Sequence, residues 1–230
     1  MTRLRPHGEA LWIADGPVVE FYGFRYPTRM AVARLARDAL FVWSPIALDA
    51  ALKAEIDALG PVTYLVSPNK LHHLSLAQWK AAYPAAQLHL PPGLAEKQPD
   101  LASGARLCGD MPAAWSGEID QACFAGSPVM SEIVFFHRAS RTALFGDLIE
   151  NFPEEWFSGW RRVVAWLDGI LAPNGGAPRE WRLTFFNRRK ARQALATVLG
   201  WHPHQVVIAH GDGVRENGEA FIRHAFRWLA

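Results

Sequence analysis

Short apolar runs separated by turn residues dominate the first 45 residues of the chain. Several of these runs are rich in β-branched and aromatic residues, and one alternates apolar and polar positions with period two. Both patterns are typical of β-strands closed by turns. We therefore expect strands within residues 10–16, 17–27, 30–36 and 40–45.

The pattern changes after Pro45. Leu48, Leu52, Ile56 and Leu59 follow the spacing of one helix face. Beyond this helix, the pattern predicts a strand, a helix and a further strand, within residues 62–68, 74–84 and 87–93. Strands that alternate with helices are the signature of an α/β layer with parallel neighbouring strands.

The second half of the chain continues this alternation. The pattern predicts two strands joined by a turn, a tryptophan-rich helical region interrupted by a loop, a last strand and a closing helix, within residues 131–149, 151–200, 205–214 and 217–230. Residues 95–121 are rich in proline and glycine, so the pattern assigns no element there. Because the chain has no internal repeat and no linker, we expect one domain over residues 1–230.

Composition narrows the function classes. Half of the residues are hydrophobic and 20% are charged, which is typical of a globular protein. The net charge of +2 is spread along the chain and gives no reason to expect a nucleic-acid partner. The amino-terminal segment lacks the apolar core of a signal peptide, and no stretch approaches the ~20 apolar residues of a membrane span. We therefore expect a soluble protein with no integral membrane segment.

The two cysteines bear on the cellular compartment. Cys108 and Cys123 form neither a C-x-x-C pair nor a disulfide framework. This favours reduced thiols and a cytoplasmic location, although two cysteines leave room for one bridge.

Candidate metal ligands follow three of the predicted strands. His72 and His73 come after the run 62–66, and Asp147 and His210 each close a later strand. In layered α/β folds, the loops that leave the carboxyl ends of strands are the usual place for ligands. Taken singly, such an aspartate is usually a turn or cap residue, and such a histidine an ordinary loop residue. Together, in this order, imidazoles and a carboxylate favour a site for zinc, iron or manganese.

Four loops carry a resemblance to a known family. "SPNKLHH", "AGSPVMSE", "LFGDL" and "IAHGDG" occur in the order of the metal-binding loops of the metallo-β-lactamase-fold superfamily. The chain looks most similar to an uncharacterised branch, a domain of unknown function marked by "SP", "HHL", "SRT" and "GDLIENF". The resemblance implies an α/β protein folded as an αββα sandwich.

The metal-binding motif is degenerate. In the family, the first loop reads H-x-H-x-D-H, and here its two early histidines become Pro68 and Lys70 while its aspartate becomes His72. The turn histidine of the second loop becomes Ser127. The resemblance then implies that one of two metals is lost. The remaining site would be formed by His72, His73, Asp147 and His210.

A single-metal hydrolase is the leading functional hypothesis. The metal would be zinc, iron or manganese and would hold a water with a lowered pKa, which attacks an ester, thioester or amide carbonyl of a small molecule. Asp147 would be both a ligand and an acceptor of the proton of that water. Lys70 is either an oxyanion-stabilising group or a solvated loop residue. Glu132 is an extra ligand, a general base or an exposed edge residue, and His137 is expected to face solvent at a turn.

Two other hypotheses stay open. The chain could be a non-catalytic relic that holds no metal and binds a partner or an apolar ligand through its aromatic surface, or a redox protein with one iron. Apolar residues recur at helix-face spacing in the tryptophan-rich region, at Trp156, Trp160, Val163, Val164 and Leu167. This stripe favours a core-facing helix. The alternatives are a homodimer surface, a lid over the site or a patch on a membrane surface, of which the first two fit better.

Overall fold

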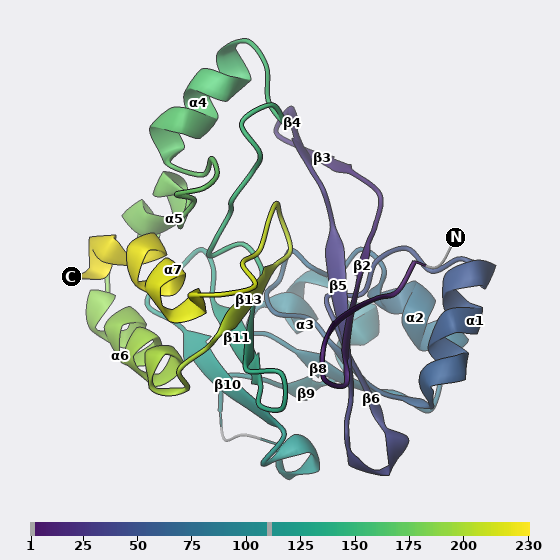
Figure 1. The fold of residues 1–230 in the computed structure, drawn as a ribbon. Coiled ribbons are helices and arrows are strands. Elements are labelled where there is room, and N and C mark those ends of the chain that lie inside the picture. The colour runs from purple at the N-terminus through teal and green to yellow at the C-terminus, as the bar shows by residue number, and fades with distance from the viewer. Residues whose placement is uncertain (1–2, 110–111) are drawn as a thin grey trace.

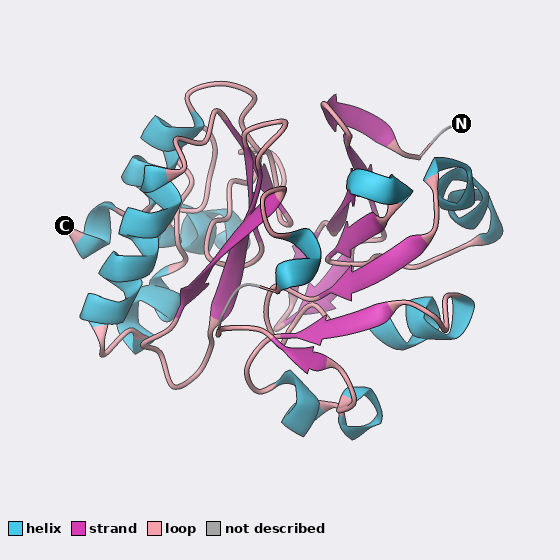
Figure 2. Ribbon diagram, turned by 90° about the horizontal axis from the view of Figure 1, so that it is seen from below, coloured by secondary structure: helices cyan, strands magenta, loops and turns pink. Residues whose placement is uncertain are grey.

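The computed structural model describes residues 3–109 and 112–230 of the chain. Two β-sheets pack face to face, and helices cover the outer face of each sheet (Figures 1 and 2). On one side lie α1 (Ala50–Leu59), α2 (Leu76–Ala82) and α3 (Leu94–Lys97); on the other lie α5 (Arg179–Thr184), α6 (Arg188–Gly200) and α7 (Gly218–Ala225). The predicted α/β class and αββα sandwich are therefore confirmed.

The larger sheet has the strand order β1-β2-β5-β6-β7-β8-β9. Its strands are β1 (Arg5–Gly8), β2 (Leu11–Asp15), β5 (Arg29–Arg34), β6 (Leu40–Trp43), β7 (Val62–Val66), β8 (Gln87–Leu90) and β9 (Ala105–Arg106). From β6 to β9 the neighbours are parallel, as the alternation of strands and helices predicts. The segment predicted as one strand within 17–27 is instead a separate hairpin of β3 (Val19–Phe21) and β4 (Phe24–Tyr26).

The smaller sheet has the order β10-β11-β12-β13. Its strands are β10 (Ile119–Phe124), β11 (Glu132–His137), β12 (Thr142–Phe145) and β13 (Gln205–Ile208). The pairs β10–β11 and β11–β12 are antiparallel, whereas β12 and β13 are parallel. Short 3-10 turns complete the fold at Ala36–Asp38, Pro99–Leu101, Ala113–Trp115 and Arg227–Leu229.

Apolar side chains form a core in each gap between layers. One core packs α1 and α2 onto the larger sheet, and another packs α6 and α7 onto the smaller one. The middle core lies between the sheets, where Phe41, Trp115 and Phe135 form a fully buried aromatic cluster. Because each strand presents alternate side chains to opposite faces, strands that are buried on both faces read as continuous apolar runs.

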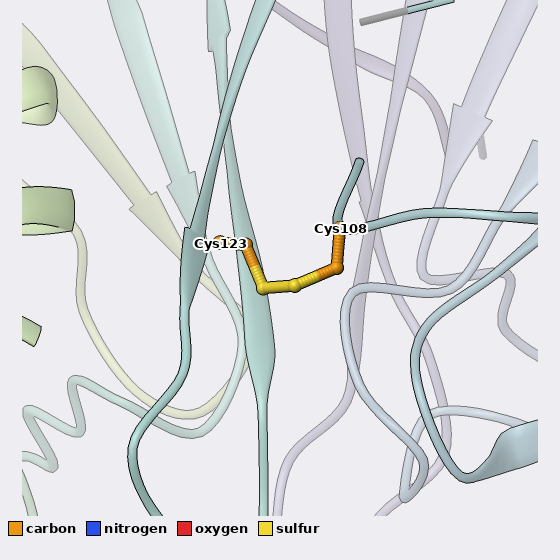
Figure 3. Close-up of a disulfide and its surroundings, with 2 residues drawn as sticks. All are labelled: Cys108 and Cys123. Atoms are coloured by element: carbon orange, nitrogen blue, oxygen red, sulfur yellow. A yellow bond between two sulfur atoms is a disulfide. The ribbon is translucent and has the colours of Figure 1, made fainter. Parts of the chain in front are cut away.

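A disulfide joins the two sheets at their edge. Cys108, just beyond β9, is bonded to Cys123 in β10, with their Cα atoms 5.2 Å apart (Figure 3). The expectation that both cysteines are reduced thiols is therefore wrong for this structure. A bond between edge strands of different sheets depends on tertiary packing, which cysteine spacing does not reveal.

Two further expectations are corrected by burial. His137 was expected to face solvent, but it is only 2% exposed and its Nδ1 lies 2.7 Å from Ser140 Oγ. The stripe on α4 (Trp160–Asp168) was expected to face the core. Instead Ala165 is the buried residue of this helix, and its large apolar side chains are exposed.

No helix within residues 3–109 and 112–230 is long and apolar enough to cross a membrane, as the sequence predicts.

Candidate metal centre

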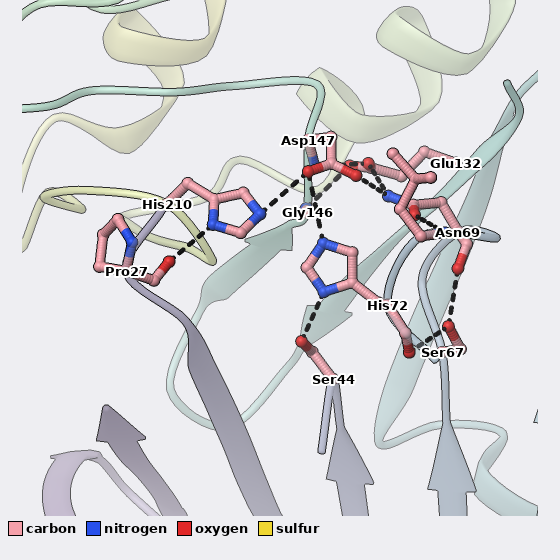
Figure 4. Close-up of polar contacts among 10 residues, drawn as sticks. Pro27, Ser44, Ser67, Asn69, His72, Glu132, Gly146, Asp147 and His210 are labelled. Carbon is pink, nitrogen blue, oxygen red and sulfur yellow. Dashed lines mark hydrogen bonds and ion pairs between the residues drawn. The ribbon is translucent and has the colours of Figure 1, made fainter. Parts of the chain in front are cut away.

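The site lies where the strands of both sheets end. Since β6 and β7 are parallel, Ser44 and the loop that contains His72 leave the same edge of the larger sheet. Asp147 and His210 follow β12 and β13, which are also parallel. Pro27 and Glu132 reach this region from the starts of antiparallel strands, β5 and β11. Polar groups from six separate segments, five of them side chains and one the Pro27 carbonyl, thus meet in one cluster (Figure 4).

Three of these side chains point their donor atoms at one another. Asp147 Oδ1 lies 3.0 Å from His210 Nε2 and 3.5 Å from His72 Nε2. One ligand atom from each residue lies within 4.8 Å of the other two. Two imidazole nitrogens and a carboxylate oxygen are the donors preferred by zinc and by non-haem iron, and a catalytic zinc commonly has three protein ligands. The donor set therefore fits a divalent metal.

Both imidazoles are held at the nitrogen that faces away from Asp147. His210 Nδ1 donates a hydrogen bond to the Pro27 carbonyl oxygen at 2.7 Å, and His72 Nδ1 lies 2.7 Å from Ser44 Oγ. Because a carbonyl only accepts, His210 carries its hydrogen on Nδ1, and neutral His210 presents a lone pair on Nε2. Such contacts orient metal-binding histidines and select their tautomer.

The other oxygen of Asp147 belongs to a buried polar network. Asn69 Nδ2 donates to Asp147 Oδ2 at 2.7 Å and to Glu132 Oε2 at 2.8 Å. Glu132 also accepts hydrogen bonds from the backbone N–H groups of Gly146 and Asp147, at 2.8 and 2.7 Å. Asn69 and Glu132 have no exposed surface. These contacts hold both the backbone and the side chain of Asp147.

The ionisable groups of the cluster shift one another's pKa. Burial raises the pKa of Glu132 to about 7, and the charge of Asp147 adds to this rise. Burial also raises the pKa of Asp147, but attraction to His72 and a hydrogen bond from His210 outweigh it and hold this pKa below its usual range. Burial lowers the pKa of His210, but the hydrogen bond to Asp147 reverses the effect and raises it overall. Contacts with the two imidazoles thus stabilise the Asp147 carboxylate inside the buried cluster.

The structure brings together three of the four metal ligands predicted from the sequence. Among the described residues, His72, Asp147 and His210 form the group whose donor atoms lie close enough together to hold a metal ion. His73 is not part of this group. Burial, followed by the charges of Lys97 and His72, lowers the pKa of His73. A fourth ligand from His73 is not supported by the proximity of donor atoms.

Lys70, the candidate oxyanion-stabilising group, does not pair with the carboxylate of the site. No ion pair within 4 Å joins Lys70 to Asp147 in the described part of the chain, and Lys70 Cδ packs beside Gly93 at the start of α3. Its neighbour Asn69 contacts Asp147 instead.

Glu132 is buried at the centre of the network. The interpretation of Glu132 as an exposed edge residue is therefore wrong. Sequence reasoning missed Asn69 and Ser44. Each follows a strand whose carboxyl end lies at the site, which was the available signal.

Comparison with solved structures identifies the fold. The DIM-1 metallo-β-lactamase superposes with a TM-score of 0.66 at 13% identity, with 99% of this chain and 95% of the other covered. The flavodiiron core of Flv1 from Synechocystis gives 0.65 at 13% identity, covering 98% of this chain and 60% of the other. FIM-1 from Pseudomonas aeruginosa, a metallo-β-lactamase in its mono-zinc form, gives 0.60 at 11% identity, covering 98% and 95%.

At the level of sequence, no protein-family model and no curated protein matches the chain.

Proposed function

We propose that this chain, which has the metallo-β-lactamase fold, is a metal-dependent hydrolase-like enzyme with one divalent metal. Its ligands are His72, Asp147 and His210, and its substrate is a small molecule with an ester, thioester or amide bond. The observation that carries the proposal is the approach of three donor atoms, from three separate strand ends, to within 4.8 Å of one another. We further propose that residues 1–230 act as one domain.

Each residue of the site has a defined task in this proposal. When bound, the metal polarises a carbonyl and lowers the pKa of water. His72 and His210 supply neutral imidazole nitrogens, oriented by Ser44 and Pro27. Asp147 would offer Oδ1 to the metal, and its carboxylate would accept the proton that the attacking water loses. Lys70 and Glu132 make no contact that places them at the reacting atoms, so the proposal assigns them no catalytic step.

We propose zinc or iron as the metal. A metallo-β-lactamase of this fold is described in a mono-zinc form, and another protein of the fold is a flavodiiron core. Two imidazoles and one carboxylate suit both metals. A cytoplasmic location stays a prediction, and the Cys108–Cys123 disulfide counts against it because reducing compartments disfavour such bonds.

Metal content and hydrolysis test the proposal directly. Protein purified without a metal-affinity tag is expected to hold one equivalent of zinc or iron by elemental analysis. The loaded protein should hydrolyse at least one member of a panel of aryl esters, thioesters and anilides, and a chelator should stop the reaction. An empty protein that takes up no zinc, iron or manganese on titration would refute the proposal.

The exposed face of α4 favours a second candidate function, binding a partner. Ala165 is buried, whereas the exposed sides of the helix carry large apolar residues, with Trp160 58% and Trp166 68% exposed. The helix lies at the outer end of the molecule beside the β3–β4 hairpin (Figure 1). Helices that cover a core turn their apolar face inward, so an outward one indicates a binding surface. The occupant that we propose is a second copy of this chain.

Changing the α4 face should dissociate such a dimer. Val163→Glu and Leu167→Glu each place a charge in the apolar face, and we expect dissociation constants at least ~10-fold higher by sedimentation analysis. Arg162→Gln, on the same helix but outside that face, is the control and should associate like the parent. A parent that stays monomeric at high concentration would exclude the homodimer.

A further inference from the structure

The amide of Asn69 lies between two buried carboxylates. We propose that Asn69 is a positioning residue whose amide takes the place of a second cation. It joins Glu132 to Asp147 and thereby limits the site to one metal. This inference rests on the proposed function, because it concerns the second half of the same site.

The orientation of the amide follows from its contacts. Asn69 Oδ1 accepts the backbone N–H of Leu71 at 2.8 Å, so Nδ2 is the atom that faces Glu132 and Asp147. The reverse orientation would place an oxygen against two carboxylates and lose three hydrogen bonds. Ser67 Oγ donates to the backbone oxygen of Asn69 at 2.7 Å and fixes the loop that carries the amide.

Two buried carboxylates that lie close together need neighbouring groups that offset their negative charge. Within the described residues, no lysine or arginine forms an ion pair with Glu132 or Asp147. In the part of the chain that the structure describes, the Glu132 carboxylate accepts hydrogen bonds from the N–H groups of Gly146, Asp147 and Asn69 alone, and Asp147 Oδ2 accepts one from Asn69. The Asn69 amide is therefore the link between the two carboxylates, a position that a cation would otherwise suit.

The space beside the amide is crowded on the side of Gly146. A Cβ atom added to Gly146 would lie 2.9 Å from Glu132 Oε2 and 3.0 Å from Asn69 Nδ2, so a larger residue there would push against both side chains. Asp147 turns Oδ2 to Asn69 and Oδ1 to the two histidines. One carboxylate oxygen is thus committed to the amide, and the other remains for a single metal.

Three substitutions of Asn69 test this role. Asn69→Asp adds a carboxylate ligand, Asn69→Ser vacates the space of the amide without adding charge, and Asn69→Leu fills the space with an apolar side chain. The readouts are the number of zinc equivalents retained after equilibrium dialysis and the melting temperature with and without chelator. Neither readout requires a substrate.

The amide role predicts a distinct result for each variant. In chelator, all three should melt about 5–10 °C below the parent, because they lose buried hydrogen bonds to charged groups. Zinc should add a second equivalent to Asn69→Asp and, more weakly, to Asn69→Ser, and it should restore their melting temperatures towards that of the parent. Asn69→Leu should gain neither the second equivalent nor the recovery. A packing role alone would give no variant an extra metal.

The outcomes separate this inference from the proposed function. A parent with one zinc and an Asn69→Asp variant with one zinc would overturn the inference and leave the function intact. A parent that takes up no zinc, iron or manganese would refute the function, and a first zinc gained by Asn69→Asp or Asn69→Ser would still support the inference. If Asn69→Asp does not fold, Asn69→Ser decides, and its failure to gain zinc overturns the inference. Two zinc equivalents in the parent would overturn it as well.

Discussion

Asp147→Ala is expected to abolish metal binding and, with it, hydrolytic activity. Asp147 supplies the only carboxylate oxygen in the described group of three donors. A metal present at ~1,000 times its dissociation constant stabilises the folded state by about 4 kcal/mol, so a chelator should lower the parent's melting temperature by about 8–16 °C. The variant has no such stabilisation to lose. Its melting temperatures with and without chelator should agree to within about 1 °C, as scanning calorimetry can determine.

The comparison with and without chelator is essential, because Asp147 also supports the metal-free fold. Its contacts with His210 and Asn69 are buried, so the variant should already melt below the parent in chelator. Asp212→Ala is the matched control: Asp212 is two residues from His210 but its side chain is exposed. This control should keep the metal and the full response to chelator. If the parent holds no metal and chelator does not change its melting, the site is a relic.

The free energy of unfolding is expected to fall steeply as the pH is lowered, at pH values where most carboxylates are still ionised. His7, His89 and His137 are buried, and burial is the main cause that lowers the pKa of each from 6.5 to about 4. The unfolded chain therefore binds these protons more tightly than the folded chain. The contribution of these histidines to the free energy of unfolding is fully present above pH ~6.5 and is lost as the pH drops towards 4. Each histidine contributes up to about 3 kcal/mol, so the three approach the whole stability of a typical domain.

Urea unfolding between pH 7 and 4.5, in chelator to remove any metal contribution, measures this dependence. Three histidines predict a loss of up to about 4 kcal/mol per pH unit between pH 6 and 4.5. His89→Phe should reduce the slope by about a third, since His89 packs against Tyr64 and Trp115 and neither ring nitrogen has a hydrogen-bond partner among residues 3–109 and 112–230. His224→Gln, at an exposed position, should leave the slope unchanged. A parent slope below about 1 kcal/mol per pH unit would contradict the prediction.

Much of the fold could be predicted because its elements carry local patterns. Leu52 and Ile56 are the buried residues of α1, as helix-face spacing requires, and Asp49 caps this helix by accepting the N–H of Leu52. The run 62–66 forms a strand buried between parallel neighbours. These patterns depend on residues within one or two turns of each other, so they survive without any knowledge of distant contacts.

The site was predictable only in part, for a related reason. Residues at the carboxyl ends of parallel strands share an edge, which brings His72, Asp147 and His210 together from three separate segments. His73 is adjacent to a ligand in sequence, but neighbouring residues point in different directions and proximity along the chain did not place it in the group. Lys70 and Asn69 illustrate the same limit, since the shorter, uncharged side chain is the one that contacts Asp147.

The sequence by itself determined much of the order of strands and helices and the α/β class, and it placed His72, Asp147 and His210 at strand ends, because periodicity and strand ends are local properties. Tertiary structure alone decided how distant segments pair. Asn69 meets Glu132 across 63 residues, and Cys108 and Cys123 meet across the edge of the sandwich. It also decided which side of α4 faces solvent. An amphipathic pattern defines an apolar face, but only the packing of the whole chain determines whether anything covers that face.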